Sequence, residues 1–263
     1  MIILKTPYLL CYNSITMPAY QDEATAIKYI DFLNSENGQI QQKILATAIL
    51  GQLPKNRNAI ILDAGCGPGW LANLLKKDFP GLEACDASPF FIKFAQSNYK
   101  DINFKVAELS QPLPYPKNHF DCVILNMVGP DLSNLALAFK NIASVLKSGS
   151  KLIMTAPNPK YTYPAAEWKR GLLGALLGQK PKLKIKNPPL SGKIIMREFG
   201  KKIQIASHYY TLDYYVQNAN DGGLKLNNQL EIKSATDSGK FDLNYQLFRY
   251  PLLLLLEFEK LGQ

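Results

Sequence analysis

Residues 61–69 read ILDAGCGPG, a short apolar run that ends in three glycines spaced two apart. An apolar run that passes into a glycine-rich turn and then into a helical pattern is typical of a buried β-strand followed by a helix. Glycine tolerates a positive φ, and because it has no side chain a ligand can approach the backbone closely. The stretch therefore predicts a strand–turn–helix unit with a binding site at the turn.

The spacing of these glycines differs from that of two common nucleotide motifs. A dinucleotide fingerprint, Gly-x-Gly-x-x-Gly, would need glycine at position 70, which is Trp70. A phosphate-binding loop would need Gly-Lys followed by Ser or Thr, and the turn lacks that sequence. A tight turn without any ligand is the plain alternative for the glycines taken alone.

Two carboxylates further along the chain favour an adenosine-containing ligand. Asp86 ends the second predicted strand, about 20 residues after the glycine turn, where a carboxylate can accept hydrogen bonds from both ribose hydroxyls. Glu108 follows the third predicted strand, where its carboxylate can accept from an adenine amino group while Leu109 offers a backbone amide. With these residues in place, a turn without ligand is the weaker interpretation.

Short β-type runs alternate with helical patterns between residues 59 and 157, which is typical of βαβ units on a parallel sheet. A helix capped by Thr211 and two further strands follow later in the chain. We expect an α/β fold with a helical cap at 1–55 and a main domain at 56–263, which an insertion at 158–207 interrupts. The predicted strands are 59–64, 82–86, 102–106, 120–127, 150–157, 228–235 and 252–260.

The segments LDAGCGPG, Asp86, AELSQPLPYPKNHFD and FKNIASVLKSGSKLIMTAP, in this order, resemble the class I S-adenosylmethionine-dependent methyltransferases, in particular the small-molecule methyltransferase group. HYYTLDYYVQNANDGGLKL followed by RYPLLLLLEFEK is similar to the last helix and last strand of that group. The resemblance implies a Rossmann-like seven-stranded sheet in the order 3-2-1-4-5-7-6, with helices on both faces. It also implies S-adenosyl-L-methionine as the cofactor.

The resemblance further implies which residues hold the cofactor. Its methionine part would lie near Asp63, Gly65, Cys66 and Gly67, its ribose near Asp86 and Ala87, and its adenine near Glu108 and Leu109, with Asn126 and Met127 at the end of the fourth strand. Tyr20 and Tyr29 in the cap could close over the sulfonium, whose charge suits an aromatic face, and core packing is the alternative.

Three departures from the family pattern concern the site. Glu108 stands where Asp is more usual, which is a conservative change. KSGS replaces the usual Pro-Gly-Gly turn before the fifth strand, and Gly129-Pro130 replaces the frequent paired histidines after the fourth. The best candidate for a general base is then His208, beside the insertion, with a packed or capping histidine as the alternative.

Residues 160–202 contain eleven Lys or Arg and only two acids, so this segment carries a charge equal to the net +9 of the whole chain. Its field would attract an anionic acceptor, an acidic partner or a membrane surface. The alternative is that the lysines protect an exposed strand from pairing with other chains. Just before the lysine run, Trp168, Leu172, Leu173, Leu176 and Leu177 would share one side of a helix, which could pack on the domain, line a pocket or lie on a membrane.

We therefore expect methyl transfer by direct displacement to a small-molecule acceptor, anionic or lipophilic. The alternatives are a methyltransferase acting on an acyl carrier protein or tRNA, and an inactive S-adenosylmethionine-binding protein. Nucleic acid ranks low because aromatic side chains are not interleaved with the lysines. The four scattered cysteines and two histidines predict no metal site, and the lack of a signal-peptide pattern predicts a cytoplasmic protein. The oligomeric state stays open.

Overall fold

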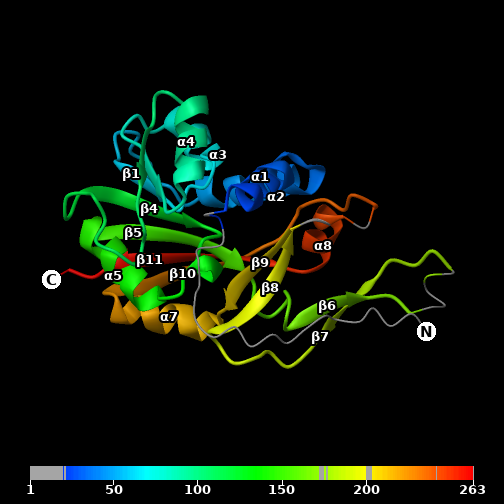
Figure 1. Cartoon of the computed structure of the whole chain (residues 1–263). Coiled ribbons are helices and arrows are strands. Elements are labelled where there is room, and N and C mark those ends of the chain that lie inside the picture. The colour runs from blue at the N-terminus through cyan, green and yellow to red at the C-terminus, as the bar shows by residue number, and fades with distance from the viewer. Residues whose placement is uncertain are drawn as a thin grey trace.

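A computed structural model describes residues 20, 22–171, 175, 177–199, 203–240 and 242–262. Its centre is a seven-stranded sheet in the order β3-β2-β1-β4-β5-β11-β10 (Figure 1). This confirms the expected Rossmann-like order, with β10 and β11 as its sixth and seventh strands. The strands are β1 (Ile61–Ala64), β2 (Glu83–Asp86), β3 (Asn103–Val106), β4 (Phe120–Asn126), β5 (Leu146–Pro157), β10 (Leu224–Ile232) and β11 (Leu253–Lys260).

The first five strands of the sheet run parallel, whereas β11 pairs antiparallel with both β5 and β10. Parallel strands all end at the same edge of a sheet. The glycine turn after β1, Asp86 at the end of β2 and Asn126 at the end of β4 are therefore brought to one edge, which is where open α/β sheets bind ligands.

Helices cover both faces of the sheet, as expected. Along β1, Leu62 packs into the core cluster that contains α5 and α7, whereas Ile61 packs into the cluster on the opposite face. Because successive side chains of a strand point to opposite faces, β1 and β4 are apolar along most of their length. The helices after β1 are α3 (Trp70–Lys76), α4 (Pro89–Asn98), α5 (Leu135–Val145), α7 (Leu212–Asp221) and α8 (Leu243–Arg249).

The described part of the N-terminal cap is helical. Asp22 caps α1 (Glu23–Asn34), and Ser35 ends that helix while capping α2 (Glu36–Leu50). Ile49 of α2 is fully buried in the same core cluster as Ile61 of β1. The cap is therefore packed on the sheet through apolar contacts. Residues 1–19 and 21, also assigned to the cap, lie outside the described residues.

The insertion forms two antiparallel ribbons, β6 (Ala166–Lys169) with β7 (Lys182–Ile185) and β8 (Lys193–Phe199) with β9 (Ile203–Tyr209). The predicted helix does not include Trp168, because Trp168 lies in β6 and its ring packs against Tyr245 and Tyr250. Leu177 lies in a turn, whereas Leu172, Leu173 and Leu176 lie outside the described residues. No helix in the described ranges is long and apolar enough to cross a membrane.

The packing of α2 predicts that substitutions at two neighbouring residues will change the free energy of unfolding by very different amounts. Ile49→Ala should lower the free energy of unfolding by about 2–4 kcal/mol because it leaves a cavity between α2 and the sheet. Leu50→Ala should change it by less than about 0.5 kcal/mol, since that side chain is largely exposed. Urea denaturation would measure both values. Equal effects would mean that the cap is not part of the cooperative core.

Candidate functional site

The glycine turn after β1 is held against the end of β2. The backbone amides of Gly65 and Cys66 both donate to the carbonyl oxygen of Cys85, at 2.7 and 2.9 Å. Gly65 and Gly67 have φ angles of +74° and +53°, a region that L side chains rarely adopt. A Cβ atom on Gly65 would lie 2.4 Å from Val128 Cγ2, whereas one on Gly67 would meet no atom within 4 Å. Gly65 thus permits close packing, and Gly67 borders open space.

Asp86 receives two backbone hydrogen bonds. The amide of Gly67 donates to Oδ2 and the amide of Ser88 donates to Oδ1, both at 2.8 Å. Each carboxylate oxygen can accept one more hydrogen bond, which is the acceptor pair that two ribose hydroxyls require. Burial raises the pKa of Asp86 to about 6, against the lowering effect of these two amides.

Asp63 is a second buried carboxyl, at the carboxyl end of β1. Neither of its oxygens has a hydrogen-bond partner among the described residues. Burial, with the nearby charge of Asp86, raises the pKa of Asp63 to about 7. A buried carboxyl without a partner is costly when ionised, so a ligand with a positive charge would favour its ionised form.

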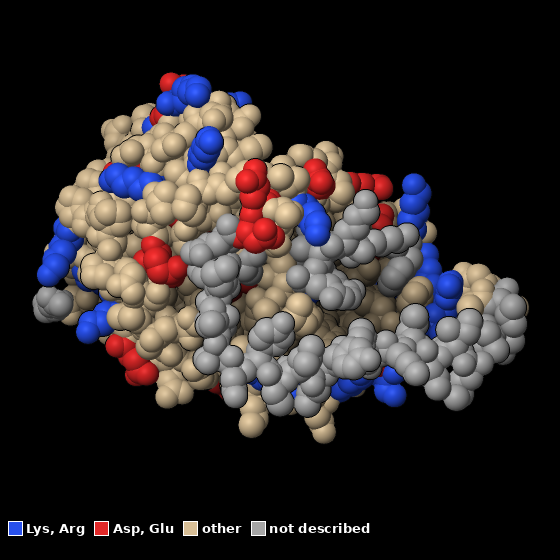
Figure 2. Space-filling model, viewed as in Figure 1, with Lys and Arg blue, Asp and Glu red and all other residues tan. Residues whose placement is uncertain are grey.

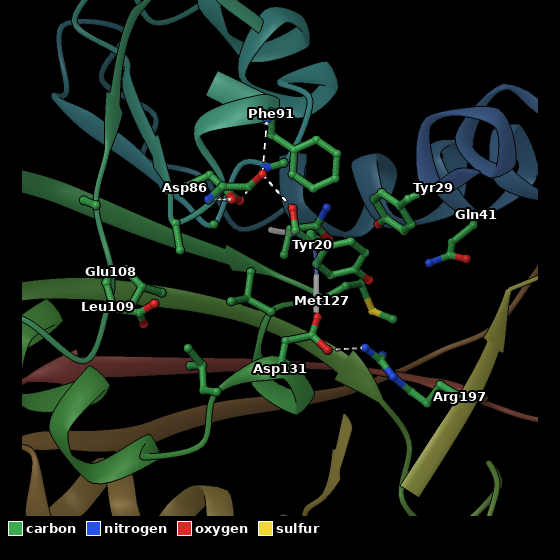
Figure 3. Close-up of a pocket in the computed structure, with 18 residues that line it drawn as sticks. Tyr20, Tyr29, Gln41, Asp86, Phe91, Glu108, Leu109, Met127, Asp131 and Arg197 are labelled. Carbon is green, nitrogen blue, oxygen red and sulfur yellow. Dashed lines mark hydrogen bonds and ion pairs between the residues drawn. The ribbon is translucent and has the colours of Figure 1, made fainter. Parts of the chain in front are cut away.

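A cavity opens above this edge of the sheet (Figure 3). All the residues expected to hold the cofactor line this cavity except Asp63 and Cys66, which are buried. The expected residues that the structure brings together here are Tyr20, Gly65, Gly67, Asp86, Ala87, Glu108, Leu109, Asn126 and Met127.

The end of β4 has an unusual backbone. Met127 has a φ of +65°, which is unfavourable for a residue other than glycine. Its amide donates to the carbonyl oxygen of Thr155 at 3.0 Å, and the Thr155 hydroxyl donates to Asn126 Oδ1 at 2.7 Å. These bonds to β5 hold the bend, so that Asn126 and Met127 both reach the cavity.

Aromatic side chains close the cavity on the side of the cap. The ring of Tyr20 lies 5.0 Å from that of Tyr29 and 5.5 Å from that of Phe91 in α4, centre to centre. The Ser88 hydroxyl donates to the carbonyl oxygen of Tyr20 at 2.8 Å, which ties this residue to the loop that carries Asp86. Tyr20 and Tyr29 both line the cavity, at positions where a sulfonium could meet an aromatic face.

A charged pair that the sequence did not indicate lies on the opposite wall of the cavity (Figure 3). Arg197 of β8 contacts Asp131, which follows β4, with 2.5 Å between Nη2 and Oδ1. Arg197 Nε also donates to the Ser207 hydroxyl, and this hydroxyl donates to Asp131 at 3.0 Å. The sequence does not distinguish Arg197 from the other basic residues of the insertion, because nothing local in it shows which side chain of a ribbon faces a cavity. Gln41 of α2 and Phe91 of α4 were also missed, because nothing local in the sequence shows which side chain of a helix faces the cavity.

His208 does not line the cavity. Ser207 and Arg197 point toward the cavity side of the β8–β9 ribbon, so the neighbouring His208 points to the other side. Its ring stacks on Tyr210 with centres 5.5 Å apart, and Nδ1 is buried without a partner among the described residues. This geometry does not support His208 as the general base. The stacked and buried ring is that of a packed histidine.

A seven-stranded sheet in this order, with a glycine turn after β1 and carboxylates after β2 and β3, defines the fold of the class I S-adenosylmethionine-dependent methyltransferases. Residues 62–154, about a third of the chain, match the family model described as "Methyltransferase domain", and the fold around them is the one this class has.

Known proteins that resemble this chain agree with the assignment. It is 34% identical over 97 residues to the malonyl-[acyl-carrier protein] O-methyltransferase of Hahella chejuensis (35% of this chain, 34% of that protein). Over 116 residues it is 31% identical to the protein of the same name from Herminiimonas arsenicoxydans (43% of each). The match thus spans less than half the length of these relatives. An S-adenosylmethionine-dependent methyltransferase structure from Mesorhizobium loti superposes with a TM-score of 0.64 at 19% identity, covering 81% of this chain and 96% of that one.

The residues present fit S-adenosylmethionine as the cofactor. Asp86 offers two free acceptor positions for a ribose, Gly67 borders space that no protein atom fills, and Asp63 is an unpartnered buried carboxyl. Glu108 and Leu109, the residues expected to hold the adenine, line the same cavity. Tyr20 and Tyr29 stand at the other end.

Two glycine substitutions should separate folding from binding. Gly67→Ala should lower stability by only about 1 kcal/mol, the cost of a positive φ, but weaken S-adenosylhomocysteine binding about tenfold or more by filling the space beside the cavity. Gly65→Ala should cost about 2 kcal/mol or more because its Cβ would collide with Val128. Thermal melts and calorimetry would measure the two effects. Normal binding by folded Gly67→Ala would show that the turn is only structural.

The raised pKa of Asp86 predicts a pH-dependent affinity. Ribose hydroxyls need the ionised carboxylate, so binding should be strong above the pKa of about 6 and should weaken as the pH falls through it. From about pH 7.5 to about pH 5, the affinity for S-adenosylhomocysteine should fall about tenfold.

Calorimetry across this pH range would test the dependence on Asp86. Asp86→Asn should bind more weakly and lose the step near pH 6, whereas Asp78→Asn, which changes a surface carboxylate, should behave like the wild type. A wild-type affinity that does not change with pH would contradict the assignment of Asp86.

Proposed function

We propose that the protein transfers the methyl group of S-adenosylmethionine by direct displacement to a small-molecule acceptor that binds between the cap and β8. One observation carries this proposal. The cavity that begins at Gly67 and Asp86 continues to side chains of the cap, such as Tyr29 and Gln41, and of the insertion, Arg197. Such a cavity offers room for a second substrate beside the cofactor.

The residues of this cavity act by positioning. When bound, S-adenosylmethionine supplies a methyl group that its sulfonium charge has already activated. Asp86 holds the ribose, the aromatic rings of the cap exclude water, and Asn126 and Met127 form the floor at the end of β4. The acceptor atom uses its own electron pair to bond to the methyl carbon as the carbon–sulfur bond breaks. The electron pair of the broken bond remains on sulfur. Alignment of nucleophile, carbon and sulfur can supply most of the rate.

We further propose that the acceptor atom is a carboxylate oxygen. Arg197, with 13% of its side chain exposed, brings a guanidinium to the cavity wall, and its partner Asp131 fixes its position. Guanidinium groups suit the planar geometry of carboxylates. The described lining contains no imidazole, amine or thiol. A carboxylate needs no such base, because it is already ionised at neutral pH.

A carboxylate carried by an acyl carrier protein is the second candidate acceptor. The names of the curated relatives, malonyl-[acyl-carrier protein] O-methyltransferase, favour it. The two candidates share the same chemistry at the reacting oxygen and differ in what holds the acceptor at the mouth of the cavity.

Transfer from methyl-labelled S-adenosylmethionine would test the reaction. The acceptors would be a panel of free carboxylic acids and the same acyl groups carried on purified acyl carrier protein. We expect S-adenosylhomocysteine and a methyl ester, which mild alkali hydrolyses to labelled methanol. An alkali-stable product would contradict a carboxylate acceptor. Absence of any transfer would contradict the proposed activity.

Arg197 should act on the acceptor and leave the cofactor unaffected. Arg197→Gln should raise the KM for the acceptor about tenfold or more, because one charge-assisted contact is lost, with little change in S-adenosylhomocysteine affinity. Arg197→Lys, which keeps the charge beside Asp131, should recover part of the loss. Lys193→Gln, an exposed position on the same strand, serves as the matched control. An equal loss of cofactor affinity would place Arg197 in the cofactor site.

A further inference from the structure

Exposed apolar side chains and lysines occur together on the two ribbons of the insertion. Six of the fifteen large apolar side chains that the described part exposes lie between residues 163 and 196. The same stretch contains seven Lys or Arg and a single acid, Glu167. We propose that ribbons β6–β7 and β8–β9 bind the surface of an anionic lipid bilayer. This proposal does not depend on the identity of the acceptor.

The β6–β7 ribbon presents a basic face. Across the ribbon Glu167 pairs with Lys184 and Lys169 with Lys182, and these four side chains share one face. The other face carries Trp168, which packs against Tyr245 of α8, so the apolar side of the ribbon is turned toward the body of the protein. Glu167 is neutralised by Lys169 and Lys186 at 2.5 and 2.6 Å. Lys182 and Lys184 remain exposed on strand β7.

Apolar side chains project from the ends and the outer face of the ribbons. Leu177, in the connection between β6 and β7, is 63% exposed, and Leu190, in the connection to β8, is 88% exposed. Ile194 and Met196 are about half exposed, on the side of β8 opposite Arg197 and the cavity. Aliphatic side chains placed this way among lysines can insert at the boundary between headgroups and acyl chains.

Two features favour a bilayer over an acidic protein as the partner. Of the seven basic residues between 163 and 196, only Arg170 is an arginine. Protein interfaces are enriched in arginine and depleted in lysine, whereas diffuse attraction to anionic headgroups needs only point charges near the surface. The exposed apolar side chains are also spread over two ribbons and their connections. A fluid bilayer accepts such a distribution, whereas a folded partner would need a matching pocket for each anchor.

The β6–β7 ribbon lies at one end of the molecule and α3 and α4 at another, with the β8–β9 ribbon between them (Figure 1). Figure 2 shows several basic side chains at the end where β6 and β7 lie in Figure 1. Exposed lysines also occur near α3 and α4, at Lys77, Lys93 and Lys100. They provide a control in which the same charge is removed far from the proposed surface.

Co-sedimentation with vesicles would test the proposal, using phosphatidylcholine alone and phosphatidylcholine with about 30% phosphatidylserine. The full chain should bind the anionic vesicles and be released by about 0.5 M salt, which screens surface charge. Lys182→Gln/Lys184→Gln/Lys186→Gln should lower the partition coefficient about one hundredfold, or about fivefold for each lysine. Leu177→Ser/Leu190→Ser should lower it about tenfold or more.

The controls are Lys77→Gln/Lys93→Gln/Lys100→Gln and Leu74→Ser/Leu137→Ser, which change exposed side chains elsewhere. Both should bind like the wild type, and unchanged melting curves would show that every variant is folded. Failure of the wild type to bind anionic vesicles would overturn the proposal. An equal loss in the control variants would also overturn it, as would salt-sensitive binding to acidic proteins without binding to vesicles.

Discussion

The contact between the glycine turn and the end of β2 is the constraint on which the site depends. The Cys85 carbonyl oxygen accepts from the amides of Gly65 and Cys66, and Asp86 accepts from the amide of Gly67. These bonds fix the turn above the sheet and leave acceptor positions on Asp86 facing the cavity. Because the turn is fixed at positive φ, space beside Gly67 stays open without any movement of the protein.

Around this contact, three parts of the chain that are distant in sequence build one cavity. The sheet edge supplies Asp86, Glu108 and Asn126, the cap supplies aromatic rings, and the insertion supplies Arg197. The two carboxyls nearest the turn are hard to ionise in the ligand-free protein, since burial raises the pKa of Asp86 to about 6 and that of Asp63 to about 7. A positively charged cofactor offsets this cost, so the electrostatics of the site favour S-adenosylmethionine over neutral or anionic ligands.

The sheet and the cofactor side of the cavity could be predicted from sequence because their signals are local. Glycine spacing, a carboxylate at a strand end and a buried strand depend on neighbouring residues, and the turn, Asp86 and Glu108 that they indicated do line the cavity. The wall opposite the turn depends on how distant segments meet, so Arg197 was missed, and His208, the expected general base, does not line the cavity. The expected helix does not begin at Trp168, because strand pairing with β7 and packing on α8 place that residue in β6.

Amide hydrogen exchange with and without S-adenosylhomocysteine tests the central claim most directly, because it locates the ligand on the chain without any substitution. The account predicts slower exchange at residues 65–70, 86–88 and 107–109 when the ligand is present, and unchanged exchange in β6 and β7. Protection absent from the glycine turn, or found only in the insertion, would contradict a cofactor site formed by the turn and Asp86.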